Sequence, residues 1–291
     1  MSSSSDSTCQ APAKINLSLK IDTRKKRTDG FHEISTLMAK LDLADELHFH
    51  KSVTTSLTCN VEGLATDESN LVMRAVREFE KVYGRKVKQR ITLTKNVPMA
   101  AGLGGGSADA AATLVALNER LGTQYHPGEL REMAAACGSD VAFFINPVPS
   151  LCKGRGEKVR PLERFATWSS PIVLLKPQFG VSTKLAYQAF GRASMRKEFF
   201  YDEQQIPDGP RLVNDLEVPV FAKFPFLGML KSWMLERPGV KGALMSGSGS
   251  TMFALTDTPE AARKLAEDAL AEIDSTLFTY CGVVNPQAVG E

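Results

Sequence analysis

A glycine-rich segment near the middle of the chain has the strongest chemical signal. It reads Pro98-Met-Ala-Ala-Gly-Leu-Gly-Gly-Gly-Ser-Ala-Asp-Ala-Ala and continues into an alanine-rich amphipathic stretch. Glycines let backbone N–H groups approach phosphate oxygens without obstruction by Cβ, and a helix start adds unpaired donors and about half a positive charge. Residues 102–112 are therefore predicted to bind the phosphates of a nucleotide.

Two familiar nucleotide-binding motifs are absent from this loop. A Walker A loop requires the lysine of G-x-x-x-x-G-K-[ST], and a Rossmann fingerprint requires a βαβ frame with an acidic residue downstream. A flexible linker is disfavoured because linkers rarely lead straight into a helix of small residues. Ser107 can either cap that helix or help to hold Mg²⁺.

Lys14 and Asp140 are candidates for the chemistry that a bound nucleotide would need. An alcohol is a poor nucleophile until its proton is taken, which a positioned carboxylate can do while an ammonium group stabilises charge. Lys14 shares one face of the alternating segment 13–21 with Asn16. Each residue alone also has a structural interpretation, Lys14 as a solvent-facing strand residue and Asp140 as a helix or turn cap. The chemical roles require the two side chains to meet beside the phosphate loop.

The hydrophobic pattern predicts the elements that must position these groups. Strands are expected at 13–21, 45–50, 53–59, 89–94, 172–175, 242–246 and 251–256. Helices are expected at 67–83, 107–121, 127–137, 182–190, 218–236 and 258–273, with Ser182 and Thr258 as N-caps, and a hairpin turn is expected at Gly154–Gly156. Because strands and helices are mixed rather than regularly alternating, we predict an α+β fold in two layers.

Composition limits the classes of partner. The 291 residues allow one large or two ordinary domains, and 35 basic against 33 acidic residues argue against a nucleic-acid or membrane-surface partner. The five cysteines are an odd number without C-x-x-C spacing, which favours reduced thiols. No window reaches the about 18 apolar residues of a membrane span, and the serine-rich start has no signal-peptide pattern. We therefore expect a cytoplasmic protein.

The motifs together resemble those of the GHMP kinase superfamily, in order and over nearly the whole chain. They are Ala11-Pro-Ala-Lys-Ile-Asn-Leu, Asp29-Gly-Phe-His-Glu, the glycine loop, Gly138-Ser-Asp-Val and Gly247-Ser-Gly-Ser-Thr. The segments G-R-G-E and N-D-L-E add a similarity to the members that phosphorylate the 2-hydroxyl of a cytidine diphosphate alcohol in non-mevalonate isoprenoid biosynthesis. The chain departs from the pattern at Ala108, Ala142 and Ser250, and none of these departures removes a catalytic atom.

The resemblance implies two domains. Residues 1–155 would form an ATP-binding and catalytic domain like domain 2 of ribosomal protein S5. Residues 156–291 would form the C-terminal GHMP kinase domain, which is ferredoxin-like, with ATP and substrate meeting between the two. The implied cofactors are ATP and Mg²⁺, and we expect a monomer or a weak homodimer.

The same resemblance implies a set of site residues. Lys14 and Asp140 would be catalytic, and Asn16, Phe31, His32 and Tyr187 would bind the substrate, with Phe31 and Tyr187 as opposite stacking walls for cytosine and His32 at its polar edge. ATP would contact Asn70, Leu71, Lys95, Pro98, Gly102, Leu103, Gly104, Gly105, Gly106, Ser107, Ala108 and Asp109.

Other interpretations stay open at this stage. Phe31 could lie in a core and His32 on the surface, and Lys95 and Asn70 could be plain surface residues. Alternative functions are a GHMP-type kinase for homoserine, a mevalonate-pathway intermediate or a sugar, and a catalytically silent nucleotide-binding relative.

Overall fold

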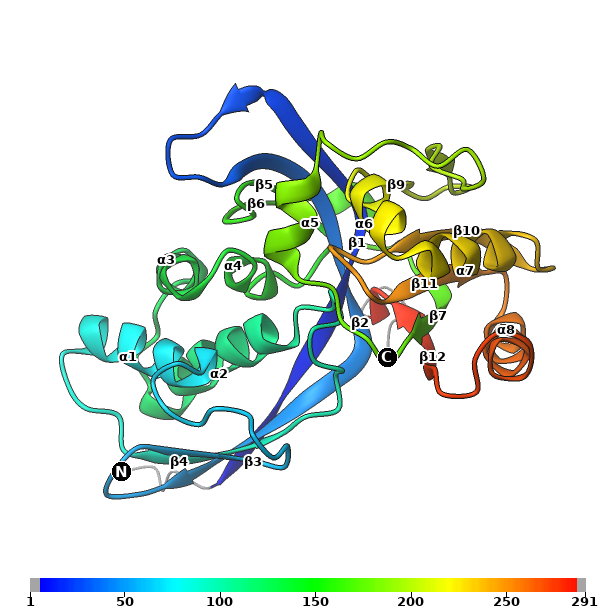
Figure 1. Cartoon of the computed structure of the whole chain (residues 1–291). Coiled ribbons are helices and arrows are strands. Elements are labelled where there is room, and N and C mark those ends of the chain that lie inside the picture. The colour runs from blue at the N-terminus through cyan, green and yellow to red at the C-terminus, as the bar shows by residue number, and fades with distance from the viewer. Residues whose placement is uncertain (1–5, 287–291) are drawn as a thin grey trace.

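Two long antiparallel strands form the centre of the protein. The structure is a computed structural model that describes residues 6–286, so the outermost residues of both predicted domains lie outside the described part. The strands are β1 (Ser7–Lys26) and β2 (His32–Lys51), each of 20 residues. Both run through the whole molecule between two groups of helices (Figure 1). Elements of either half therefore share the same two strands.

The N-terminal group of elements adds strands to β2 and covers them with helices. Strand β4 pairs antiparallel with β2 and parallel with β3, and β5 pairs with β2 and β6. The elements are β3 (Ser56–Cys59), α1 (Leu71–Tyr83), β4 (Gln89–Thr94), α2 (Gly105–Leu121), α3 (Pro127–Cys137), α4 (Val141–Phe144), β5 (Ser150–Gly154), β6 (Lys158–Pro161) and a 3₁₀ turn η1 (Glu163–Phe165).

The C-terminal group is joined to the same strands. Strand β12 pairs with β2 and β7, while β9 pairs parallel with β1. The elements are β7 (Ser170–Lys176), α5 (Thr183–Ala189), β8 (Gln204–Gln205), β9 (Arg211–Asn214), α6 (Glu217–Lys223), α7 (Pro225–Leu235), β10 (Val240–Met245), β11 (Met252–Thr256), α8 (Pro259–Glu272) and β12 (Phe278–Val284).

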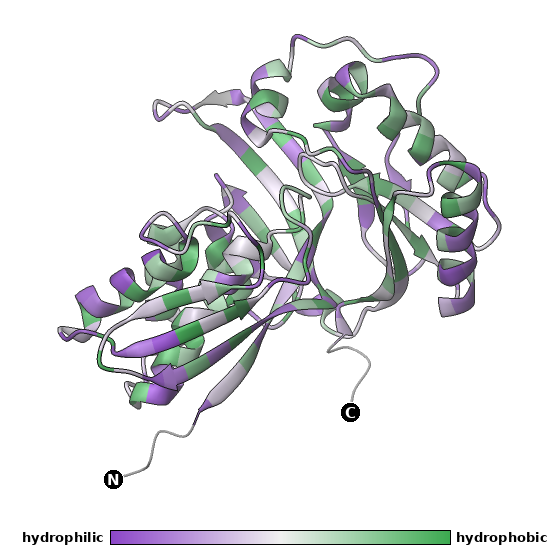
Figure 2. Cartoon of the chain, turned by 60° about the horizontal axis from the view of Figure 1, so that its bottom comes forward, coloured by the Kyte–Doolittle hydropathy of each residue, from purple (hydrophilic) through white to green (hydrophobic). Residues whose placement is uncertain are grey.

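Three hydrophobic cores hold these layers together. One lies between α1–α4 and the sheet, one lies under α6–α8, and the third is enclosed by the central strands and β7, β10 and β11. Hydrophobic stretches accordingly face the inside of each layer, and hydrophilic ones lie on the outer helix faces (Figure 2). Removing this apolar surface from water is the main driving force for packing the layers.

A β-bulge in β1 changes which residues face which side of the sheet. The register between β1 and β2 shifts between Asn16 and Ser18. Ala13, Ile15 and Leu17 belong to the third core, whereas Leu19 and Ile21 belong to the core under α6–α8. An extra residue in one strand reverses the inside–outside alternation beyond it. Lys14 and Asn16 thus face one side of the sheet, and Ser18 and Lys20 face the other.

Most of the predicted elements are confirmed, as is the α+β class. The predicted helix 127–137 and strand 89–94 have the observed bounds, and Ser182 and Thr258 cap α5 and α8 through their side chains. The single helix predicted at 218–236 is wrong, because the chain breaks at Phe224 before Pro225. Proline disfavours helical conformation in the preceding residue. The separate strands predicted near 13–21 and 45–50 are parts of the much longer β1 and β2.

The predicted boundary between residues 155 and 156 falls in the tight turn that joins β5 and β6. The division into two domains at that point stays a prediction. Among the helices of residues 6–286, none combines the length and apolar character that crossing a membrane requires.

The core under α6–α8 contains a buried ion pair whose contribution to stability can be tested. Lys231 is fully buried, and its Nζ donates to Glu217 Oε2 at 2.6 Å, while Glu217 Oε1 accepts from the backbone N–H of Met245. Burial raises the pKa of Glu217, and the Lys231 charge opposes this effect. Glu217 therefore depends on Lys231 to remain ionised inside the protein.

We expect Lys231→Met to lower the free energy of unfolding by about 3–5 kcal/mol near pH 8, because it leaves a buried carboxylate without its cation. The loss should shrink toward pH 5, since a raised pKa in the folded state lets Glu217 take up a proton as the pH falls. Urea unfolding at both pH values measures this. Arg263→Met, which breaks an exposed pair with Glu260, is the control and should change little. An equal loss at both pH values would contradict the explanation.

Candidate active site

A cavity of about 990 Å³ lies between the two groups of helices, a size within the range of small-molecule sites. It is formed by β1, β2, the glycine loop, the turn before α4, α5 and the loop between β10 and β11. Sixteen of the predicted site residues line it: Lys14, Asn16, Phe31, His32, Asn70, Leu71, Lys95, Pro98, Gly102, Leu103, Gly104, Gly105, Gly106, Ser107, Asp140 and Tyr187. Ala108 and Asp109 are not among its lining residues and are buried behind the wall.

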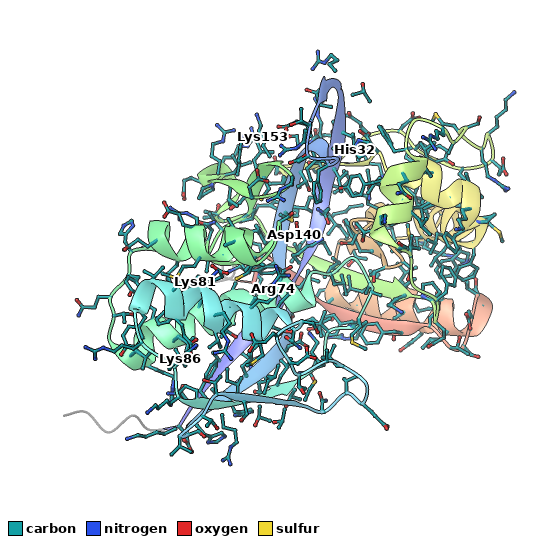
Figure 3. All side chains as sticks on the ribbon, turned by 60° about the vertical axis from the view of Figure 1, so that its left-hand side comes forward. His32, Arg74, Lys81, Lys86, Asp140 and Lys153 are labelled. Carbon is teal, nitrogen blue, oxygen red and sulfur yellow. The ribbon has the colours of Figure 1, made fainter. Side chains whose placement is uncertain are left out.

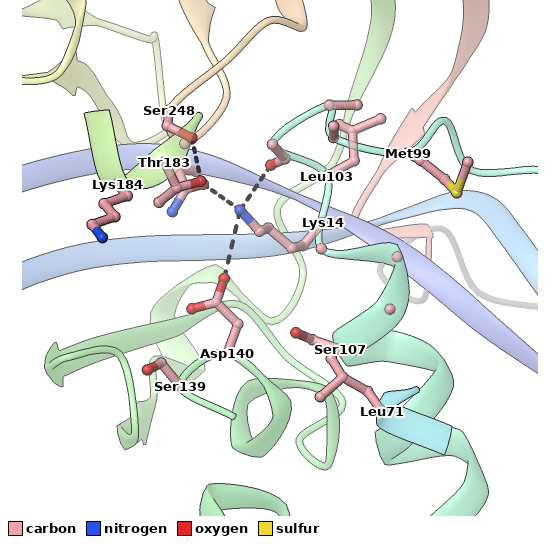
Figure 4. A pocket seen from close by; sticks show the side chains of 18 of the residues that line it. Lys14, Leu71, Met99, Leu103, Ser107, Ser139, Asp140, Thr183, Lys184 and Ser248 are labelled. Atoms are coloured by element: carbon pink, nitrogen blue, oxygen red, sulfur yellow. Dashed lines mark hydrogen bonds and ion pairs between the residues drawn. The ribbon is translucent and has the colours of Figure 1, made fainter. Parts of the chain in front are cut away.

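Lys14 is held in the floor of this cavity. Its side chain is only 4% exposed, so its interpretation as a solvent-facing strand residue is wrong. Nζ donates to the backbone oxygen of Gly102 at 2.8 Å and to Asn16 Oδ1 at 2.6 Å, and it lies 4.0 Å from Asp140 Oδ2 (Figure 4). Burial lowers the pKa of Lys14, and the Asp140 charge acts in the opposite direction. The ammonium group is therefore fixed between the phosphate loop and the carboxylate.

Asp140 lies at the start of α4 but does not cap it. It has the N-cap position of α4, and its side chain accepts no capping hydrogen bond there. The side chain is 36% exposed and points toward Lys14. Gly156 makes room for it, because a Cβ at that position would lie 3.0 Å from Asp140 Oδ1. The carboxylate is thus available to a molecule in the cavity.

The glycine loop ends in a helix start that faces the same cavity. Helix α2 begins at Gly105 after Gly104, which has a left-handed conformation and no side chain to cap the helix. Ser107 lies inside the first turn, so its predicted capping role is wrong. The first amides of a helix have no intrahelical partner, and this turn contains no acidic residue. The N–H groups of residues 105–107 therefore form an anion-binding position.

The C-terminal glycine loop supports the phosphate loop from behind. Gly102 has φ +74°, and a Cβ there would lie 2.1 Å from the backbone oxygen of Ser246. Ser246 Oγ also donates to the oxygen of Gly102 at 2.9 Å, and Thr251 N–H donates to the oxygen of Ala101. Only glycine permits this contact between two loops that are about 145 residues apart in sequence.

Lys95 belongs to a buried group of three charges. Its Nζ donates to Asp45 and to Asp109 Oδ2, the latter at 2.8 Å, so a plain surface role for Lys95 is wrong. Asp45 Oδ1 also accepts from the backbone N–H groups of Asn96 and Val97. Burial raises the pKa of Asp109 to about 7; the Lys95 charge opposes this rise and the Asp45 charge adds to it. Asp109 does not line the cavity, and it can influence a molecule bound there only by holding Lys95, which does.

Aromatic rings line the end of the cavity that is formed by the start of β2 and by α5. Phe31 is 53% exposed, and the Arg155 guanidinium lies 5.1 Å from its ring centre, so Phe31 is not a core residue. The His32 and Tyr187 rings are stacked at 5.5 Å with an angle of 21°. His32 is the first residue of β2 and lines the same cavity as Asp140; Figure 3 labels both residues beside the long central strands. Tyr187 was predicted to face Phe31, and in the structure its ring contacts His32.

Asn70 and Leu71 are positioned by the start of α1. Asn70 caps this helix through Oδ1, which accepts from Val72 N–H at 2.9 Å, and its Nδ2 donates to the oxygen of Ala65. Leu71 packs near Gly106, where a Cβ would lie 3.6 Å from its Cδ1. Asn70 is thus a structural cap that also lines the cavity.

Oxygen ligands for a metal are sparse in the cavity. Residues 6–286 contain no group of three or more His, Cys, Asp or Glu side chains that could hold a metal ion. Ser107 and Asp140 line the cavity and have oxygen donors. These two residues fit a magnesium ion only if phosphate oxygens and water supply most of its coordination, as is usual for Mg²⁺.

Family models and solved structures match this chain over both halves. The GHMP kinases N terminal domain matches residues 70–146, and the GHMP kinases C terminal model matches residues 204–273. The 4-diphosphocytidyl-2-C-methyl-D-erythritol kinase of Methylacidiphilum infernorum is 41% identical over 84% of both chains, and that of Thermoanaerobacter pseudethanolicus is 37% identical over 92% of this chain and 93% of the relative. A crystal structure of 4-(cytidine 5'-diphospho)-2C-methyl-D-erythritol kinase is 34% identical, with a TM-score of 0.76 over 96% of this chain and 99% of the other.

This chain belongs to the 4-diphosphocytidyl-2-C-methyl-D-erythritol kinase family of GHMP kinases. A homoserine kinase from Cytophaga hutchinsonii, 19% identical with a TM-score of 0.64 over 94% of this chain and 93% of that one, shows the shared fold. The predicted family and the two-part GHMP kinase fold are therefore confirmed.

Several residues of this kinase site were missed by the sequence analysis. Thr183 and Ser248 both line the cavity and form a hydrogen bond of 2.8 Å between α5 and the C-terminal glycine loop (Figure 4). Asp45 and Thr36 are buried polar residues in β2. A buried polar side chain within a hydrophobic strand pattern is the signal that could have singled out Asp45 and Thr36.

Thr36 fixes the orientation of the Asn16 amide. Thr36 Oγ1 donates to the oxygen of Ser18 at 2.6 Å and accepts from Asn16 Nδ2 at 2.7 Å. Because the ammonium of Lys14 can only donate, the amide oxygen of Asn16 must face it. Thr36 is thus a positioning residue, two hydrogen bonds away from Lys14.

We expect Thr36→Val to lower kcat about tenfold with little change in the KM for ATP, because the amide of Asn16 loses its anchor and Lys14 its fixed acceptor. The basic limb of the pH–rate profile should move to lower pH, since a turned amide would disfavour the protonated lysine. Thr36→Ser keeps the hydroxyl and should restore both quantities. A serine variant as slow as the valine variant would contradict this role.

Proposed function

We propose that this enzyme transfers the γ-phosphoryl group of ATP to the 2-hydroxyl of 4-diphosphocytidyl-2-C-methyl-D-erythritol, a step in isoprenoid precursor biosynthesis. The observation that carries the proposal is the Lys14–Asp140 pair beside the glycine loop, in a cavity that also contains aromatic side chains. Membership in the kinase family supports the same reaction.

Asp140 takes the proton of the acceptor hydroxyl in this proposal. Its carboxylate is exposed to the cavity and is not used to cap α4. Lys14, fixed by Gly102 and Asn16, orients the hydroxyl and stabilises negative charge that develops on the transferred group. Because phosphoryl transfer depends mostly on positioning and electrostatics, the fixed geometry of these groups is the main contribution of the protein.

The glycine loop holds the phosphates of ATP. The N–H groups at the start of α2 supply donors. Mg²⁺ that arrives with ATP would neutralise phosphate charge, and Ser107 and Asp140 are the side chains that would hold it. Asn70, Leu71, Lys95 and Pro98 form the wall where we place the adenine and ribose. Asp109 acts there indirectly by holding Lys95, and Ala108 packs behind the loop.

The aromatic end of the cavity receives the cytidine group. Phe31 is exposed and offers a stacking surface, and His32 presents polar ring nitrogens beside it. Tyr187 supports the His32 ring by stacking. Asn16 lines the same cavity and accepts from Lys14, so it is placed to contact an acceptor alcohol beside that lysine.

We expect Asp140→Asn and Lys14→Ala each to lower kcat by at least ~10²-fold, the usual scale for acid–base and electrostatic groups, while ATP binding is kept. A coupled assay of ADP release measures turnover, and calorimetry measures ATP affinity. Lys153→Ala, an exposed change on the neighbouring strand β5, is the control. Near-wild-type rates in both variants would refute the assigned roles.

The alternative within the superfamily is a kinase for homoserine, a mevalonate-pathway intermediate or a sugar. The exposed Phe31 beside His32 favours an acceptor with a base to stack. We expect turnover with the cytidine diphosphate alcohol and none with homoserine or galactose in one panel assay. Phe31→Ala should raise the KM for the cytidine substrate about tenfold and leave the KM for ATP unchanged, because it removes a stacking surface only.

A further inference from the structure

A second cavity lies on the reverse face of the central sheet. It has a volume of about 600 Å³, and residues of β1, β2, β5, β6, η1, β8 and β9 line it. The β-bulge in β1 contributes to its lining, because beyond the bulge Ser18 and Lys20 face this cavity while Lys14 and Asn16 face the active site. The two cavities therefore share a wall made of β1 and β2.

One row of residues across five strands forms the floor. Val213 pairs with Ser18, Ser18 with Leu37, Leu37 with Leu151, and Leu151 with Arg160. All five line the cavity. Paired residues of neighbouring strands project from the same face of a sheet. The floor is thus built by the fold itself, with a mainly apolar centre and a cation at one end.

The lining of this second cavity concentrates positive charge. Lys20, Arg160, Arg164 and Arg211 line the cavity against one carboxylate, Glu203, which leaves three unbalanced positive charges. The whole chain has a formal net charge of only +2. Glu203 contacts Lys20 and lies 3.6 Å from Arg211. The excess is therefore local and does not reflect the composition of the chain.

The two arginines at the other end have no acidic partner. Within residues 6–286, neither Arg160 nor Arg164 forms an ion pair, and Arg164 stacks on the Phe165 ring at 4.7 Å. Guanidinium groups bind phosphate oxygens in a bidentate manner, more specifically than ammonium groups do. Leu151 and the small exposed parts of Leu37 and Phe165 give the same cavity an apolar lining.

We infer that this second cavity binds a small organic phosphate, with its phosphate on Arg160 and Arg164 and its organic part over Leu37, Leu151 and Phe165. A volume of about 600 Å³ accommodates a molecule of that size. The inference stands independently of the substrate proposed for the active site, because none of these residues lines the first cavity.

The chain contains a natural reporter for this site. Of its two tryptophans, Trp168 lies next to the cavity: its ring centre is 6.4 Å from that of Phe165, and a Cβ on Gly209 would lie 2.7 Å from its Nε1. Trp233 is on α7, where it donates to Glu272. Trp233→Phe leaves Trp168 as the only tryptophan, which can be excited selectively over the five tyrosines.

The experiment titrates the Trp233→Phe protein with phenyl phosphate and with inorganic phosphate at constant ionic strength, with the active site saturated by a non-hydrolysable ATP analogue. We expect a saturable change in Trp168 fluorescence, with phenyl phosphate binding more tightly than inorganic phosphate. Arg160→Ala with Arg164→Ala should weaken phenyl phosphate binding by at least about tenfold, since each charged hydrogen bond is worth that much.

Two controls make the result decisive. Arg85→Ala with Lys88→Ala removes two exposed cations outside both cavities and should leave phenyl phosphate binding unchanged. Arg164→Glu reverses one positive charge of the site by a single surface substitution and should also weaken phenyl phosphate binding. Circular dichroism checks the folding of each variant. The inference is overturned by a non-saturable response, by equal weakening in the control variant, or by equal affinity for both phosphates.

Discussion

The burial of the Lys14 ammonium is the interaction on which the arrangement of this kinase depends. A lysine inside a protein must be surrounded by acceptors, and here they come from three separate segments: Gly102 of the phosphate loop, Asn16 of the same strand, and Asp140 before α4. Satisfying one ammonium therefore brings together the parts that the proposed reaction needs. The lysine both stabilises this geometry and supplies charge within it.

The contacts around Lys14 extend into both halves of the chain. Gly102 also accepts from Ser246, and its lack of a Cβ lets the loop between β10 and β11 pack directly against the phosphate loop. The amide of Asn16 is anchored to Thr36 on β2. The active site is thus held by loops at the junction of two cores, while β1 and β2 provide the rigid frame. Such a junction of layers is a usual place for a ligand cavity.

The bulge in β1 lets the same two strands line a second cavity. Without it, Ser18 and Lys20 would share the face of Lys14, and two more polar groups would crowd the catalytic cavity. With it, they line the basic cavity on the reverse side, and Leu19 takes a place in the active-site wall. One extra residue therefore separates two environments of different charge on a single strand.

Local patterns in the sequence determined the elements and the chemistry of the phosphate loop, because glycine content, helix caps and alternation depend on neighbouring residues. Together with the resemblance of the motifs to a known family, they were enough to predict the α+β class, the family and sixteen of the residues that line the active-site cavity, but not Thr36, Thr183 or Ser248. Tertiary structure alone decided the burial of Lys14, the Asp45–Lys95–Asp109 group, the contact of Tyr187 with His32 and the change of face after Asn16. Each of these depends on a partner that is distant along the chain or on strand register, and neither is encoded in the spacing of neighbouring residues.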